Sequence, residues 1–67
     1  MTRGAWLRAL HAHDDAARAM RVLREAPSHR AQDRADAAIA RFRRAIAGWS
    51  DRQIAALRRK TVEEIEC

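Results

Sequence analysis

The residues that interrupt helices constrain the fold most strongly. The chain has one proline, Pro27, and two glycines, Gly4 and Gly48. Proline cannot donate the hydrogen bond of a helix interior and disfavours helical geometry at the preceding residue, whereas glycine readily adopts the left-handed conformation that ends many helices. No stretch alternates apolar and polar residues as a strand does. The sequence therefore predicts a single all-α domain over residues 1–67, with breaks beside Pro27 and Gly48.

Between these breaks, three segments have the apolar spacing of amphipathic helices. We expect them at about residues 3–25, 28–47 and 51–65. Together they predict a helical hairpin plus a short third helix, which is a small helical bundle. Either the three helices fold over one another, or two hairpins pair into a dimeric bundle.

Local chemistry marks two of the helix starts. Ser28 is a good N-cap for the second helix, because its hydroxyl can accept a backbone N–H of the first turn. Ser50 and Gln53 have the spacing of a capping box, flanked by Trp49 and Ile54 at the two positions of a hydrophobic staple. These signals predict that the third helix begins directly after Ser50.

The apolar faces of the three segments form a candidate core or self-association surface, because their residues recur at helical spacings. Its residues are Trp6, Leu10, Ala17 and Met20 in the first segment, Ile39, Phe42 and Ile46 in the second, and Ile54, Leu57 and Ile65 in the third.

This core is thin. Although 48% of the residues are hydrophobic, 16 of them are alanine, and leucine, isoleucine, valine and phenylalanine together number 11 of 67. Small domains with so few bulky apolar residues commonly need a disulfide, a metal or a second subunit. The single cysteine, Cys67, offers no internal disulfide. We therefore expect a homodimer or a state that a partner stabilises.

The charge balance favours acidic partners. The net charge is +5, and the basic residues are 13 arginines and one lysine. Together with the many alanines, this composition indicates a GC-rich, bacterial or phage coding sequence. On the first helix, Asp14 with Arg18 and Arg21 with Glu25 have the spacing of ion pairs along a helix, so these charges are expected to compensate one another.

The candidate binding site is a row of arginines on the second helix, namely Arg30, Arg34, Arg41 and Arg44. At 100° per residue its members lie within about 80° of one another, opposite Ile39 and Ile46, and the row spans about 21 Å. Asp33 is the only acid beside it. Such a row can contact successive phosphates or grip carboxylates, although it can also be a solvated face of an arginine-rich protein. With the tryptophan that would anchor a partner if exposed, the candidate binding residues are Arg30, Arg34, Arg41, Arg44 and Trp49.

Catalytic and metal-binding patterns are missing from the sequence. There is no nucleophile paired with a base and no glycine-rich phosphate loop, so we predict that the protein is not an enzyme and has no catalytic, cofactor or metal residues. His11 and His13 are related by a rotation of about 200° about the helix axis and so point to nearly opposite sides, which means that one ion cannot reach both. The position of His13 on the apolar seam favours an interior histidine, whose protonation at low pH would loosen the bundle.

The segment 48–57, followed by Thr61 and Val62, resembles a DNA-binding helix-turn-helix. It departs from that motif because only three residues, 58–60, separate its two halves, and none of them is glycine or another residue typical of turns. The sequence therefore predicts one continuous helix here, and the resemblance identifies no family.

These features favour a non-enzymatic helical regulator, adaptor or inhibitor that binds a protein partner with an acidic surface. The alternative is a nucleic-acid-binding accessory protein that uses the arginine face of the second helix. Docking on an anionic membrane through an amphipathic helix is a third option. No apolar run approaches the roughly 18 residues of a membrane span, and the first residues lack the apolar region of a signal peptide, so a cytoplasmic location is expected.

Overall fold

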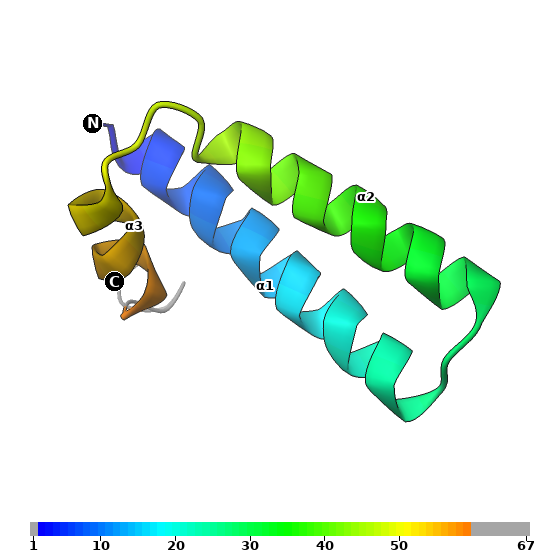
Figure 1. Cartoon of the computed structure of the whole chain (residues 1–67). Helices are drawn as coiled ribbons and strands as arrows, with labels where there is room; N and C mark the ends of the chain where they lie inside the picture. The colour runs from blue at the N-terminus through cyan, green and yellow to red at the C-terminus, as the bar shows by residue number, and fades with distance from the viewer. Residues whose placement is uncertain (1, 60–67) are drawn as a thin grey trace.

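The computed structural model describes residues 2–59, which form three helices and no strand (Figure 1). The helices are α1 (Arg3–Glu25), α2 (His29–Ala45) and α3 (Asp51–Arg58). Helices α1 and α2 lie side by side as an antiparallel hairpin, and α3 lies beside the end of the hairpin at which α1 begins (Figure 1). The predicted all-α fold, a helical hairpin with a short third helix, is confirmed. Residues 60–65 of the predicted third helix lie outside the described residues.

Hydroxyl side chains cap all three helices. Thr2 and Ser28 each accept a hydrogen bond from the backbone N–H three residues further on, at 3.1 and 3.0 Å. Before α3, the Ser50 hydroxyl accepts the N–H of Gln53 at 3.2 Å, while the Gln53 side-chain oxygen accepts the N–H of Ser50 at 2.9 Å. The predicted Ser28 cap and the Ser50–Gln53 capping box are both confirmed.

The two turns between the helices contain the predicted helix-breaking residues, Pro27 and Gly48. Helix α1 ends at Glu25, two residues before Pro27. Helix α2 ends at Ala45, and Gly48 then takes a φ of 83°, the only positive φ among the described residues. This left-handed residue reverses the chain, so that α3 packs back against the hairpin.

Alanines form the seam between α1 and α2. The buried residues of this seam are Ala16 and Ala19 on α1 and Ala35 and Ala38 on α2, with Leu23 and Ile39 partly buried against them. Such small side chains let the two helix axes approach closely. The seam therefore buries little apolar volume for its length.

A second cluster fixes α3 to the hairpin. Leu10 of α1 and Leu57 of α3, at 1% and 0% exposure, are the largest fully buried side chains of the described residues. Partly buried aromatic rings surround them, including Trp6 and Trp49, whose ring centroids lie 5.1 Å apart, and Phe42. The bulky part of the core is therefore concentrated at one end of the hairpin.

Two residues assigned to the core or the self-association surface are exposed in the single chain. Met20 is 38% exposed, and Ala17 is also exposed. The reason is the position of α3, whose cluster on α1 includes Trp6 and Leu10 but nothing further along the helix. Ala17 and Met20 are therefore not core residues of one chain, and their role in self-association stays a prediction. Ile65 lies outside the described residues.

His13 is not the interior histidine that the sequence suggested. Its side chain is 35% exposed, its ring packs edge-on against Phe42 with centroids 5.4 Å apart, and its Nδ1 lies 3.8 Å from a carboxylate oxygen of Asp14. A position at the edge of the seam explains this partial exposure, because α3 does not extend over it. The expected loosening of the bundle by protonation of a buried His13 therefore loses its structural basis.

Candidate functional site

The arginine row of α2 lies on the surface. Arg30, Arg34, Arg41 and Arg44 are all exposed, while the alanines that face α1 are buried. Within residues 2–59, none of these four arginines takes part in an ion pair. Among the described residues, the neighbouring Asp33 therefore forms no ion pair with the row, and the four arginines of the row are exposed.

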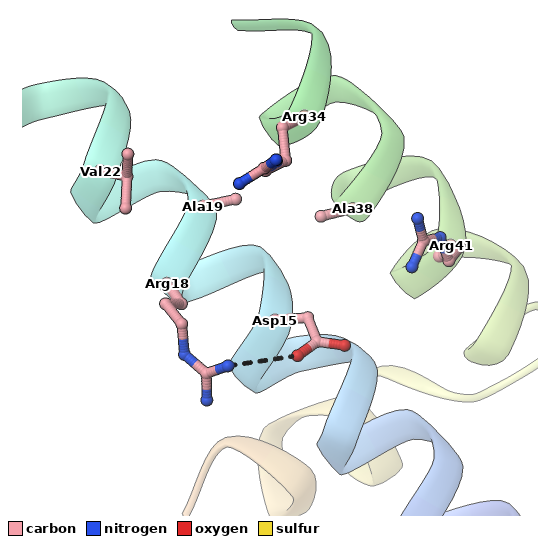
Figure 2. A pocket seen from close by; sticks show the side chains of 7 residues that line it. All are labelled: Asp15, Arg18, Ala19, Val22, Arg34, Ala38 and Arg41. Carbon is pink, nitrogen blue, oxygen red and sulfur yellow. Dashed lines mark ion pairs between the residues drawn. The ribbon is translucent and has the colours of Figure 1, made fainter. Parts of the chain in front are cut away.

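Part of the row borders a groove between α1 and α2. The central hollow, of about 340 Å³, is lined from α2 by Arg34, Ala38 and Arg41 and from α1 by residues of the range 15–22 (Figure 2). A hollow of about 210 Å³ adjoins it towards Pro27, and the two share Arg34 and a valine. A hollow of about 340 Å³ adjoins it towards the start of α1, and these two share Ala38, Arg41 and an aspartate. Because neighbouring hollows share lining residues, they form one continuous groove.

Arginines of both helices line this groove. Arg30, Arg34 and Arg41 line it from α2, and Arg8 and Arg18 line it from α1. Figure 2 shows Arg34 extending from α2 towards α1, whereas Arg18 lies on α1 with its guanidinium group beside Asp15. We call this surface, defined by its five arginines, the arginine groove.

The floor of the arginine groove is apolar. Ala19 and Ala38, both 7% exposed, lie at its centre, and the partly buried Ala12 and Ala45 continue the floor towards the start of α1. Val22 lines the groove on α1 and is 44% exposed, which makes it the most exposed large hydrophobic side chain of the described residues. The groove thus combines apolar surface with cationic walls.

One carboxylate lies in the groove. Asp15 has a carboxylate oxygen 3.9 Å from a guanidinium nitrogen of Arg18, as the dashed line in Figure 2 marks. The two side chains are 55% and 71% exposed, so water and salt screen this pair and it contributes little stability. The expected pairing of Arg18 with Asp14 is wrong, because Asp14 lies beside His13 instead. Among the described residues, five arginines and one aspartate line the groove, so these residues give it a positive net charge.

Two of the predicted binding residues lie elsewhere. Arg44 borders a separate shallow hollow on α2 that Asp36 and Arg43 also line. Trp49 packs against Trp6 in the cluster that holds α3. The structure therefore brings Arg30, Arg34 and Arg41 together in the groove but separates Arg44 and Trp49 from it.

The α1 side of the groove was not predicted from the sequence. Arg8, Ala12 and Ala19 are separated by steps of four and seven, which is the signal that places them on one face of a helix. Arg18 was assigned to a self-compensating pair and was therefore not considered as part of a site. Which face of α1 turns towards the arginines of α2 becomes evident only when the two helices are paired.

The arrangement is suited to binding anionic groups. A guanidinium group presents N–H donors in a fixed fork that matches a carboxylate or a phosphate. Within residues 2–59, no three metal-ligating side chains gather at one point, and none of the helices there is long and apolar enough to cross a membrane. Comparison of the chain with protein-family models, with curated proteins and with solved structures finds no match.

Proposed function

We propose that the protein is a small, non-enzymatic regulator, adaptor or inhibitor that acts in the cytoplasm by binding an acidic surface of a partner protein. The observation that carries this proposal is the row of exposed α2 arginines that have no ion pair within residues 2–59. Arginines are common among the residues that dominate protein interfaces, because the guanidinium group forms several hydrogen bonds and also covers apolar surface. An acidic partner supplies the carboxylates that these arginines lack within residues 2–59.

Apolar surface beside the arginines favours a protein partner over a nucleic acid. Val22 and the alanine floor lie between the arginine walls. A protein partner can bury these apolar groups against its own, and that burial contributes to the affinity. The sugar-phosphate backbone of a nucleic acid offers charge in the same place but little apolar surface.

Nucleic-acid binding is the second candidate, favoured by the net charge of +5 and by the extent of the arginine row. The two functions differ in their response to salt. Titration with an 18-base-pair duplex at 20 and 200 mM salt would show affinity falling steeply if phosphate contacts dominate. We expect weak binding at 20 mM salt; tight, salt-dependent binding would favour the second candidate instead.

The protein-binding proposal is tested by capture from the native host, with the full-length chain as bait. We expect one stoichiometric partner, lost with the double variant R34E/R41E, because two attractive contacts become repulsive. R21E/R52E is the matched control: it makes the same change in net charge at exposed positions that line none of the three hollows of the groove. Equal recovery by R34E/R41E and the unchanged protein would contradict the proposal.

We further propose that the protein acts as a homodimer. Support comes from the thin alanine seam and from Met20, which is 38% exposed on α1. Met20 and Val22 are two residues apart and so point about 160° away from each other on the helix. A dimer formed through the Met20 side therefore leaves the arginine groove open to a partner.

A further inference from the structure

Building on the proposed function, we infer that the arginine groove is the docking site of one acidic amphipathic α-helix of the partner protein. This docking site specifies the shape of the partner and its pattern of charge. It also includes two binding residues of α1 in addition to the arginine row of α2. These are Arg8 and Arg18, which line the groove opposite Arg34 and Arg41.

The shape of the groove fits a helix. It runs between two antiparallel helices, where a third helix packs in helical bundles. From Arg30 to Ala45, both of which line it, the groove extends about 22 Å at 1.5 Å per residue. A helix of about 15 residues, roughly four turns, has this length. The floor of small alanines lets such a helix approach closely with a ridge of apolar side chains.

The charges specify the flanks of that helix. Arginines stand on both walls of the groove, Arg8 and Arg18 on one side and Arg30, Arg34 and Arg41 on the other. A helix with an apolar ridge over the alanine floor would place its two flanks against these walls. Glutamate or aspartate on both flanks would then pair with the arginines, whereas lysine or arginine there would be repelled.

A second copy of this chain is a poor occupant. Helix α1 has five arginines against three acids, α2 has five against two, and α3 has two against one. Each helix of a second copy would therefore bring excess positive charge into a groove that is already positive. Among the described residues, no helix of a second copy therefore suits the groove, whereas an acidic helix of another chain does.

A designed peptide tests the inference directly. The probe is an 18-residue helical peptide with alanine and leucine along one face and glutamate on both flanks. A control peptide has the same composition in an order that mixes the two residue classes around the helix. Fluorescence anisotropy with the full-length protein at 100 mM salt measures both affinities, because the Debye length of about 10 Å then screens distant charges. We expect the segregated peptide to bind at least about tenfold more tightly, since only it matches the apolar floor and the two walls together.

Charge variants locate the site. R8E/R18E should weaken binding of the segregated peptide about tenfold or more, because two contacts become repulsive, whereas R44E lies outside the groove and should change it less than about threefold. Val22→Ala removes exposed apolar surface without changing charge and should weaken binding about three- to tenfold. R21E/R52E is again the control for charge, and far-ultraviolet circular dichroism checks that every variant keeps its helix content.

The outcomes separate the two proposals. If R34E/R41E and R44E weaken binding but R8E/R18E does not, the peptide binds the outer face of α2; the groove inference then fails while the proposed function stands. If neither R34E/R41E nor R8E/R18E weakens binding, both fail. Tighter binding of the duplex than of the segregated peptide would also overturn both.

One remaining outcome concerns the acidic residues Glu63, Glu64 and Glu66, which lie outside the described residues. If E63Q/E64Q/E66Q binds the segregated peptide about tenfold more tightly than the unchanged protein, the chain's own end already competes for the groove. That result would overturn a partner helix as the groove's ordinary occupant. We expect affinities within about twofold of each other, as the partner-helix inference requires.

Discussion

Replacing Leu57 with alanine should release α3 from the hairpin. Leu57 is 0% exposed and is the only buried residue of α3. It packs in the cluster of Leu10 and Ala9, next to the paired rings of Trp6 and Trp49. The remaining positions of α3 are partly buried or exposed, so the attachment of this helix depends mainly on one side chain.

The size of the effect follows from that burial. Truncating a fully buried leucine to alanine removes about 2–5 kcal/mol of stability. A chain of 67 residues has a free energy of unfolding of about 3–10 kcal/mol in total. An eight-residue helix does not persist alone in water, so α3 should lose its structure when it loses this contact. At about 4–8 °C per kcal/mol, we expect the Tm to fall by about 8–40 °C.

Tryptophan fluorescence and circular dichroism measure the two consequences separately. Trp6 and Trp49 border the Leu57 cavity, so their emission should shift to longer wavelength as water enters. The melting curve at 222 nm gives the Tm. Val22→Ala, at an exposed position, is the control and should change the Tm by less than about 3 °C. An L57A variant with unchanged emission and unchanged Tm would show that α3 is not held by this side chain.

Three further substitutions and measurements test other parts of the structure. Ser50→Ala removes the hydroxyl acceptor of the capping box and should lower the free energy of unfolding by about 1 kcal/mol; an unchanged Tm would contradict the role of the cap. Ala35→Leu should destabilise the hairpin by about 1–3 kcal/mol or more, because Ala35 is 0% exposed, whereas Ala37→Leu on the outer face of α2 should be nearly neutral; equal Tm values for the two would refute close packing at the seam. Light scattering should give a mass twice that of the 7.6 kDa monomer, and Met20→Lys should reduce the measured mass to that of one monomer. A mass of 7.6 kDa for the unchanged protein at every concentration would exclude the proposed dimer.

The helix boundaries were predictable because local chemistry sets them. Pro27 ends α1, the Ser28 hydroxyl caps α2, and the Ser50–Gln53 box begins α3, each through residues only a few positions apart. A left-handed residue at Gly48 follows from the same local reasoning. These features depend on no contact between helices, so the sequence alone contains them.

Exposure was harder to predict because it depends on how far one helix covers another. Met20 has the spacing of a core residue, yet α3 is too short and too far towards the start of α1 to cover it. The sequence predicts that Trp49 anchors a partner if it is exposed, and only its packing on Trp6 shows which contact it makes within one chain. Predicting the exposure of such residues requires knowing how elements that are distant in the sequence lie relative to one another.

The groove was missed for a related reason. The sequence alone places Arg30, Arg34 and Arg41 on one face, because they share a helix and the rotation of 100° per residue fixes their directions. Arg8 and Arg18 join them only through the rotation of α1 about its own axis in the hairpin. A site made from two helices is therefore visible in the sequence as two unrelated half-sites.

The alanine seam links the small core of the hairpin to the proposed binding groove. Ala19 and Ala38 pack α1 against α2, and the same two residues form the centre of the groove floor. Larger side chains at these positions would bury more apolar surface, but they would also fill the hollow between the arginine walls. Because one set of small residues serves both purposes, substitutions that enlarge them should decrease partner binding even where the hairpin tolerates them. A partner helix laid over the alanines would add the apolar contacts that the isolated hairpin lacks, so that binding would stabilise the fold.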